Sequence, residues 1–346
     1  MRSIHGLTRA ATLALTLSLL PSLASAQQTV RIAQGFSAVS FLPMWGARAL
    51  NTFQAEGLTA TTILSPGGDT AALAALDAGD ADIAAVGTEP VLRAMAKGQP
   101  FQIVYSLMSK VTLEVVVAPS FLEKAGVKPT DPLQKRIAAL KGATIGVGAI
   151  GGTQETAARW LVAKAGLDPK ADIKVAQVGT PVAIQAALEN KRIDAFVLSP
   201  PEGYLASKSG SGTVLIRLGD EFPLLANQPY LVMVAKKPID AKTSELIVKT
   251  LRALQSASAA LVKDPDAAAA AIQKQFFAKA DPDAIAAAVK SLASGVASGG
   301  KLDVENFQNQ LVFSKEVGTN FGKEFDAAGS KEDLWTNGFV EKAMTK

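Results

Sequence analysis

Short β-rich runs alternate with amphipathic stretches in the first part of the chain. Apolar residues at helical spacing predict helices at 41–53, 70–78 and 89–97, the first with Ser40 as its N-cap. Strands that alternate with helices predict a parallel sheet with right-handed crossovers. The predicted strands are residues 30–34, 61–64, 82–86 and 101–107.

The same order begins again in the middle of the chain and is followed by a long helical part from residue 241. A helix is expected at 154–165, and the helical part is expected to break at Asp264-Pro265, at Asp281-Pro282 and at 298–300. Pro and Gly are the residues that most strongly interrupt helices. The predicted strands of this half are residues 113–118, 143–147, 173–178, 195–198 and 230–235.

Two segments of the chain resemble each other. Residues 63–98 align with residues 175–210 without a gap, at an offset of 112. Gly67/Gly179 and Asp82/Asp194 are among the identical pairs. A repeat of this length indicates a duplicated domain rather than a solenoid. We therefore expect two similar α/β lobes with a cleft between them, and we expect the paired Asp residues to maintain the fold.

Residues 1–26 have the features of a secretory signal. Arg2 and Arg9 form a positive n-region, residues 10–20 an apolar h-region, and 24–26 an A-x-A cleavage site. The apolar run is too short to span a bilayer. No Cys follows it, so a lipid anchor at a mature N-terminal Cys is excluded. The sequence thus predicts a cleaved, exported, non-anchored protein of the periplasm.

Cleavage of this segment would restrict the chemistry of the mature chain. His5 is the only His, and the chain has no Cys, so Ser-His-Asp and Cys-His catalysis and the usual zinc ligands are excluded. Loss of Arg2 and Arg9 leaves 33 basic and 31 acidic residues. This balance, without a Lys/Arg cluster, argues against nucleic acid as a partner. We expect no metal and no cofactor.

Five segments together resemble a known family. In chain order they read VRIAQGFSAVSFLPMWGA, ALDAGDADIAAVG, LKGATIGVGAIGGTQETAARWLV, AALENKRIDAFVLSPP and DLWTNGFVEKA. Over essentially the whole mature chain, the sequence is similar to type II periplasmic substrate-binding proteins of ABC importers. It most resembles the nitrate/sulfonate/taurine (NitT/TauT) and thiamine-pyrimidine-precursor receptors.

The resemblance implies an α/β fold of two Rossmann-like lobes with mixed sheets, a two-crossing hinge and a helical C-terminal region. Lobe 1 would comprise residues 27–108 and 230–346, and lobe 2 residues 109–229. The hinge would lie near 107–112 and 225–229. It also implies a monomeric, non-enzymatic receptor for a small solute, whose partner is an ABC permease in the inner membrane.

Ligands of parallel α/β lobes bind beyond the carboxyl ends of the strands. This rule selects the loops 35–43, 66–70 and 87–90 in one lobe, and 148–154, 178–182 and 199–204 in the other; the family binds its ligand at the corresponding loops. The candidate ligand-binding residues are Phe36, Ser37, Ser40, Phe41, Pro66, Gly67, Gly68, Thr88, Glu89, Gly151, Gly152, Thr153, Gly179, Thr180, Ser199, Pro200, Glu202 and Tyr204.

Each candidate allows a second interpretation. The N–H groups around Gly152 and Thr153 suit a carboxylate or sulfonate, unless this is a plain turn with Thr153 as N-cap. Glu89 and Glu202 could bind an amine or only complement a helix dipole. Aromatic side chains at Phe41 and Tyr204 could contact the ligand or pack in the core.

The charge of these loops also indicates the kind of ligand. None of the loops contains Arg or Lys. A zwitterion or a neutral polar ring therefore fits better than a strongly anionic ligand such as nitrate or phosphate. Sulfonates, aromatic carboxylates and pyrimidines remain open.

Three other functions have to be weighed. Residues 146–151 form a literal GxGxxG, which is typical of dinucleotide-binding oxidoreductases. However, the strand at 173–178 ends in Gly179-Thr180, without the acidic residue that binds a ribose. Relatives that make the thiamine pyrimidine use His and Cys, which the mature chain lacks. A periplasmic sensing module for a separate signalling partner is the third alternative.

Overall fold

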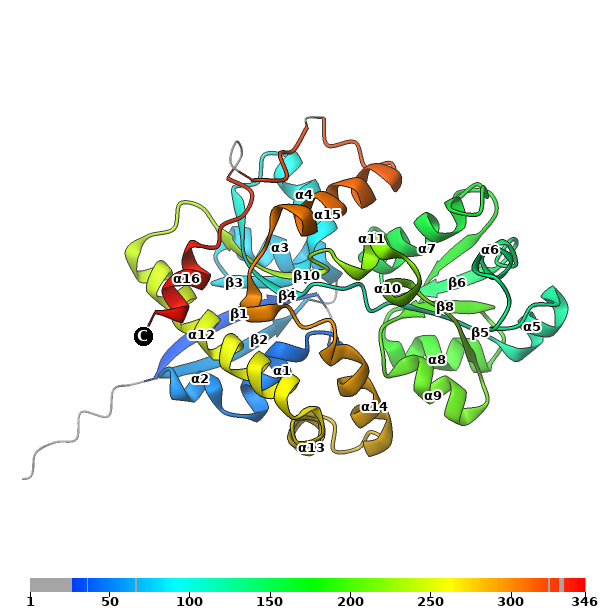
Figure 1. The fold of residues 1–346 in the computed structure, drawn as a ribbon, viewed down its shortest axis with the longest axis horizontal. Helices are drawn as coiled ribbons and strands as arrows, with labels where there is room; N and C mark the ends of the chain where they lie inside the picture. The colour runs from blue at the N-terminus through cyan, green and yellow to red at the C-terminus, as the bar shows by residue number, and fades with distance from the viewer. Residues whose placement is uncertain (1–26, 36, 66, 323, 330–332, 346) are drawn as a thin grey trace, which may run out of the picture.

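The computed structural model describes residues 27–345 except 36, 66, 323 and 330–332. Its strands form two five-stranded sheets, ordered β2-β1-β3-β10-β4 and β7-β6-β8-β5-β9. We call the units built around these sheets lobe 1 and lobe 2; they lie side by side in Figure 1. The strands are β1 Gln28–Gln34, β2 Leu58–Leu64, β3 Ile83–Gly87, β4 Phe101–Met108, β5 Glu114–Val117, β6 Thr144–Val147, β7 Lys174–Gln177, β8 Ala195–Leu198, β9 Thr213–Arg217 and β10 Leu231–Lys236.

The two sheets have the same topology. In each, four strands run in the same direction, and one antiparallel strand lies between the third and the fifth strand of the order. In lobe 1 the antiparallel strand is β10, which follows the last helices of lobe 2, and in lobe 2 it is β5, which directly follows β4 of lobe 1. The duplication therefore extends over both sheets, which are mixed rather than parallel.

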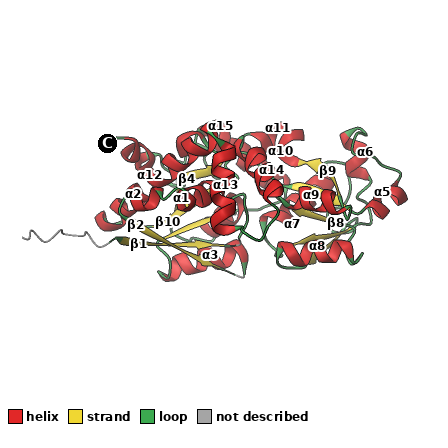
Figure 2. Ribbon diagram, turned by 90° about the horizontal axis from the view of Figure 1, so that it is seen from below, coloured by secondary structure: helices red, strands yellow, loops and turns green. Residues whose placement is uncertain are grey.

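Helices cover both faces of each sheet (Figure 2). Alternate residues of β10 reach different cores: Val232 and Val234 belong to one apolar cluster, and Met233 and Ala235 to the other. This alternation is the period of two that a sheet covered on both faces requires. The helices of the two lobes are α1 Leu42–Ala49, α2 Thr52–Ala55, α3 Gly68–Ala78, α4 Thr88–Ala96, α5 Pro119–Ala125, α6 Leu133–Ala138, α7 Thr153–Ala163, α8 Pro181–Glu189, α9 Glu202–Ser209, α10 Leu218–Glu221 and α11 Pro223–Ala226.

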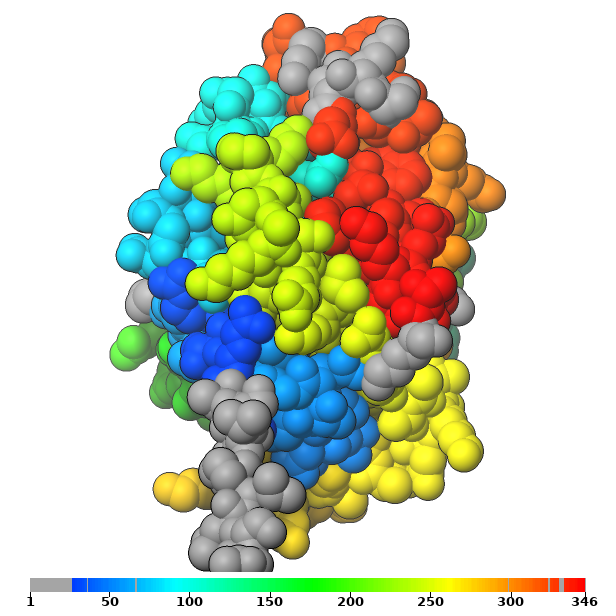
Figure 3. All heavy atoms as spheres, turned by 90° about the vertical axis from the view of Figure 1, so that its left-hand side faces the viewer, coloured from blue at the N-terminus to red at the C-terminus, as the bar shows by residue number. Residues whose placement is uncertain are grey.

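The C-terminal part is helical and packs mainly on lobe 1. It comprises α12 Ala241–Lys263, α13 Pro265–Phe276, α14 Pro282–Ala293, the 3-10 turn Ser298–Gly300, α15 Val304–Glu316 and α16 Gly338–Met344. Asp side chains cap α12 to α15, and Pro begins α13 and α14, so the predicted breaks are confirmed. The start of α12 and α16 cover the end of lobe 1 that faces away from lobe 2 (Figure 3).

One predicted helix is wrong in extent. Residues 41–53 do not form a single helix, because Asn51 adopts a left-handed conformation (φ 57°) between α1 and α2. Asn is one of the few residues that tolerates this region. The residue before α1 is Phe41, and no side chain caps the helix, so Ser40 is not its N-cap. Strand β9 was not among the predicted strands.

Asp82 and Asp194, the paired Asp residues, accept equivalent backbone hydrogen bonds in the two lobes. Asp82 accepts a hydrogen bond from the backbone N–H of Arg31 at 2.7 Å, and Asp194 accepts one from Thr144 at 2.8 Å. Arg31 and Thr144 occupy equivalent positions in β1 and β6. Each carboxylate therefore satisfies the same backbone donor of two equivalent strands, β1 and β6, and the expected role in maintaining the fold is confirmed.

The chain crosses between the sheets twice, after β4 and before β10. The two crossings are hydrogen-bonded to each other: the N–H of Gln228 donates to the carbonyl of Ser109 at 2.9 Å, and that of Tyr230 to Met108 at 2.8 Å. Paired crossings of this kind restrict relative motion of the lobes to bending about a short axis.

Candidate functional site

A cavity of about 400 Å³ lies between the lobes at the carboxyl ends of the parallel strands. Both lobes line it, as the position of the strand ends predicts. Its lining residues are Gly35, Ser37, Ala38, Ser40, Leu64, Ser65, Gly68 and Tyr230 from lobe 1 and its crossing, and Gly148, Ala149, Gln154, Gly179, Thr180, Pro181, Leu198, Ser199 and Glu202 from lobe 2. We call this cavity the cleft.

Many of the candidate ligand-binding residues come together here. Those that line the cleft are Ser37, Ser40, Gly68, Gly179, Thr180, Ser199 and Glu202. Phe36 and Pro66 lie outside the described residues. The cis peptide Pro200-Pro201 directly precedes Glu202 at the start of α9, and Gly67 precedes α3.

Other candidates lie elsewhere. Phe41 is fully buried in the core, and Thr88 donates its hydroxyl to the carbonyl of Pro229. Tyr204 is 37% exposed, with the ammonium of Lys208 at 5.9 Å from its ring centre. These three side chains are not part of the cleft lining.

Glu202 is the ionisable acid in the cleft wall. It is the first residue of α9 and is half-buried. The pKa of Glu202 is raised to about 7, mainly by burial and also by the nearby carboxylate of Glu114, although a hydrogen bond from its own backbone N–H lowers it. Among the described lining residues there is no Arg or Lys. The charge in this cleft is therefore negative or zero.

Tyr230 forms part of the cleft on the crossing side and was not among the sequence candidates. Its buried hydroxyl hydrogen-bonds with Ser199 and Thr112, whose own side-chain oxygens are 2.8 Å apart. Burial raises the pKa of Tyr230 above its ordinary value, so the hydroxyl stays neutral. Tyr230 could have been found in the sequence from its position next to a predicted crossing between the lobes. The rule that ligands bind beyond the carboxyl ends of strands did not select this position.

The turn before α7 is occupied by side chains of its own helix. The N–H of Gly148 donates to Gln154 Oε1 at 2.7 Å, and that of Gly151 donates to Glu155 Oε2 at 2.7 Å. Gly152 precedes α7, and Thr153 does not act as its N-cap. Two N–H donors of this turn are thus already paired, and Gly151, Gly152 and Thr153 are not in the cleft lining.

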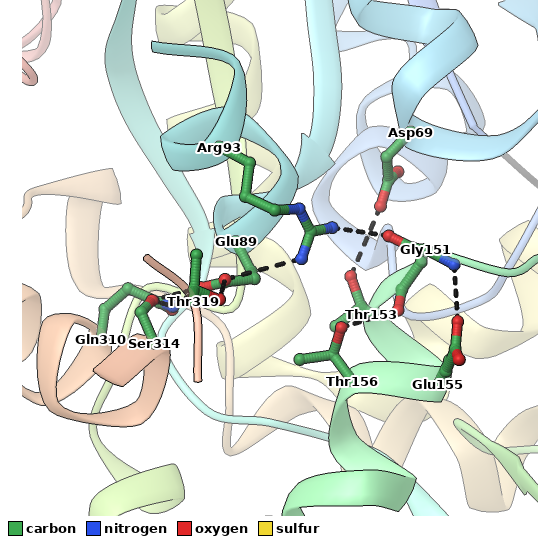
Figure 4. A network of polar contacts seen from close by, with 11 residues as sticks. Asp69, Glu89, Arg93, Gly151, Thr153, Glu155, Thr156, Gln310, Ser314 and Thr319 are labelled. Atoms are coloured by element: carbon green, nitrogen blue, oxygen red, sulfur yellow. Dashed lines mark hydrogen bonds and ion pairs between the residues drawn. The ribbon is translucent and has the colours of Figure 1, made fainter. Parts of the chain in front are cut away.

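This turn instead joins the lobes (Figure 4). Arg93 on α4 donates from Nη2 to the carbonyl of Gly151 at 2.6 Å, and its Nη1 lies 3.6 Å from Glu89 Oε1. Thr153 Oγ1 donates to Asp69 Oδ2 at 3.4 Å. Two links between lobe 1 and lobe 2 therefore lie beside the cleft.

Glu89 belongs to this network rather than to the cleft. Its buried carboxylate accepts hydrogen bonds from Gln310, Ser314 and Thr319, which lie in or after α15 (Figure 4). These partners lie more than 220 residues further along the chain. The carboxylate holds the C-terminal part against α4 and orients Arg93 toward lobe 2.

Asp69 is a second buried carboxylate close to the cleft. Burial raises the pKa of Asp69 to about 6, against hydrogen bonds from the backbone of Gly87 and from Thr153. Within the described part of the chain, Asp69 Oδ1 has no hydrogen-bond partner. A Cβ added to Gly35, which lines the cleft, would lie 2.7 Å from that oxygen. Only glycine backbone therefore separates Asp69 from the lining.

The described residues include neither a cluster of metal-ligating side chains nor a membrane-spanning helix. They contain no group of three or more His, Cys, Asp or Glu side chains that could hold a metal ion. No described helix combines the length and apolarity needed to cross a bilayer.

The fold has solved counterparts. A protein from Bordetella bronchiseptica RB50 aligns with a TM-score of 0.74 at 24% identity, over 92% of this chain and 97% of the other. The periplasmic aliphatic sulphonate binding protein SsuA of Escherichia coli aligns at 0.65 and 18% identity, over 89% and 92%. The periplasmic nitrate-binding protein NrtA of Synechocystis PCC 6803 aligns at 0.70 and 14%, over 91% and 88%.

At these identities the likeness concerns the fold, which is that of periplasmic binding proteins with two mixed sheets and a helical C-terminal region. A comparison with curated protein sequences gave no match. The profile of the NMT1-like family matches residues 15–324, which is most of the chain. The chain therefore belongs to the NMT1-like family.

Proposed function

We propose that the chain is a periplasmic receptor that binds a small organic solute and delivers it to an ABC permease. The observation that carries the proposal is the cleft of about 400 Å³ at the strand ends of two lobes. Family membership and the folds of SsuA and NrtA support a binding protein of an import system. Residues 1–26 would be the cleaved export signal, and the mature receptor would be a monomer.

Binding would act through closure of the lobes about the paired crossings at 109–113 and 227–230. Arg93 and Thr153 link the lobes on one side of the cleft. On the α15 side, Trp160 Nε1 donates to Glu316 Oε2 at 2.7 Å, and Lys164 Nζ lies 2.6 Å from the same oxygen. A solute favours the closed form only by the contacts that it gains from the second lobe.

A third link involves α9 and α14. Lys208 forms an ion pair with Asp281, the N-cap of α14. Closure would thereby hold two surfaces of lobe 1 and lobe 2 at a fixed spacing, which a permease can recognise. The C-terminal helices contribute to two of these links. Their position relative to lobe 2 would therefore differ between the empty and the occupied cleft.

The dinucleotide alternative has little support. Gly146 lies inside β6, and the N–H of Gly148 already donates to Gln154. The first Gly of the motif therefore lies in a strand rather than in the turn, and one N–H of the turn is already paired. A sensing role would use the same cleft and differ only in the partner that recognises the closed form.

Two measurements test the proposal. A panel of small organic solutes should contain one that raises the thermal unfolding temperature, because a ligand at 100 times its Kd adds about 2.7 kcal/mol of stability. Cells without the gene should lose uptake of that solute. Uptake that persists in these cells, with tight binding in vitro, would favour the sensing role.

The control is Ser37→Trp. Ser37 is exposed and lines the cleft, so the indole would fill the cavity without disturbing the core. A stabilisation that survives in this variant would place the solute outside the cleft and contradict the proposal.

A further inference from the structure

The lining of the cleft is unfavourable for a negatively charged ligand. Glu202 is its ionisable side chain, and the described lining contains neither Arg nor Lys. Asp69 adds a second carboxylate behind the backbone of Gly35, with one oxygen unpaired among the described residues. An anionic group in this space would face two carboxylates without a cation to neutralise it.

The helix N-termini of lobe 2 at the cleft compensate for this only in part, because some of their N–H groups are already paired. At α7, Gln154 and Glu155 accept the N–H groups of the turn. At α8, Thr180 caps the N–H of Ala183, and Pro181 has no N–H. At α9, the carboxylate of Glu202 accepts its own N–H. At each of these three places the chain itself therefore takes up part of the N–H groups that could hold an anion.

The size and surface of the cleft require an organic body. Its volume of about 400 Å³ lies within the roughly 300–1,000 Å³ of sites for organic ligands. This volume far exceeds the roughly 30 Å³ that one water molecule occupies in the liquid. An inorganic anion has only a few more atoms than water, so it would fill a small part of the cleft. Apolar side chains reach the cavity from both lobes: Ala38, Leu64, Ala149, Pro181 and Leu198.

We infer that the cleft selects an organic solute with an apolar body and a protonated amine or amidine that pairs with Glu202, in preference to sulfonates and inorganic anions. This inference rests on the proposed function and specifies its ligand. Glu202 is the specificity-determining residue, because a half-buried carboxylate without a cation gains most from a charge-assisted partner. Ser199 and the hydroxyl of Tyr230 would orient the polar end of the solute.

The test compares four probes that share one ring: benzylammonium, benzyl alcohol, benzoate and benzenesulfonate. Their dissociation constants are measured by calorimetry at pH 8. We expect benzylammonium to bind at least 10-fold more tightly than either anion. Glu202→Gln should abolish this preference, since loss of a charged hydrogen-bond partner typically weakens binding by about 10-fold or more.

The matched control is Glu189→Gln, which removes an exposed carboxylate from the end of α8, outside the cleft lining. It should leave the preference for benzylammonium unchanged. Tighter binding of benzoate or benzenesulfonate, or a preference that survives Glu202→Gln, would overturn the inference. Failure of all four probes to bind at 10 mM would overturn it as well.

The proposed function can be tested separately from this charge assignment. An anionic probe whose binding is lost in Ser37→Trp would show that the cleft binds solutes and that Glu202 does not select them. Uptake of a solute lost with the gene would support the receptor in the same way, whatever the charge of that solute.

Discussion

The contact between Arg93 and Gly151 gives the sharpest test of the proposed closure. Arg93→Ala removes a charge-assisted hydrogen bond of 2.6 Å between the lobes and the cation beside Glu89. Such bonds contribute roughly 1.5–3 kcal/mol when shielded from water. The Arg93 side chain is 31% exposed, so solvent screening reduces this to about 1 kcal/mol. The ratio of open to closed molecules should then rise about five-fold.

Distances between spin labels measure this ratio directly. The chain has no Cys, so cysteines placed at Glu123 on α5 and Val262 on α12 can be labelled selectively. Val262 is 61% exposed, and Glu123 is exposed as well. Pulsed electron resonance should show a longer-distance population that grows in Arg93→Ala.

The control variant removes a charge one helical turn after Arg93. Lys97→Ala deletes an exposed cation at the end of α4, which has no contact with Gly151 among the described residues. Circular dichroism would confirm that both variants are folded. Distance distributions that are identical in wild type, Arg93→Ala and Lys97→Ala would refute the role of Arg93 in closure.

Two predictions concern stability. Asp82→Ala and Asp194→Ala should each cost about 1–2 kcal/mol in urea unfolding, because each leaves the first strand of one lobe with an unpaired N–H; a cost in only one variant would contradict their equivalence. The pKa of Asp69 is higher in the folded than in the unfolded chain. The contribution of Asp69 to the free energy of unfolding is therefore fully present below about pH 4 and is lost as the pH rises through about 6. Asp69→Asn should therefore gain up to about 3 kcal/mol relative to wild type between pH 4 and pH 8; a flat difference would show that Asp69 does not titrate in this range.

The sequence predicted all the described strands except β9 because these follow from local patterns, and the internal repeat predicted two similar lobes. The period of two in the strands and the Asp-Pro helix starts persist in the structure. The break at Asn51 was missed, since apolar spacing continues across it and only the backbone conformation reveals it.

The site could be predicted only in part, because side-chain direction and distant partners decide it. Glu89 is the second residue of α4 and Glu202 the first of α9, so their side chains differ by about 100° around the helix axis. One faces α15 and the other lines the cleft. A pattern of residue types cannot distinguish these two outcomes.

The expected anion contact at residues 151–153 illustrates a second limit. The turn has the Gly residues and the helix start that suit an anion. Gln154 and Glu155, which follow directly, accept two N–H groups of this turn, those of Gly148 and Gly151. Whether a polar side chain folds back onto its own helix N-terminus depends on packing that the local sequence does not specify.

The measurement that tests the central claim most directly is native mass spectrometry of the mature chain purified from the cells that produce it. The account predicts a non-covalent organic adduct that carries a protonatable nitrogen, that is released on unfolding, and that is absent from Ser37→Trp. A wild-type chain that is always free of adducts, or an adduct that persists in Ser37→Trp, would contradict a solute receptor that binds in this cleft.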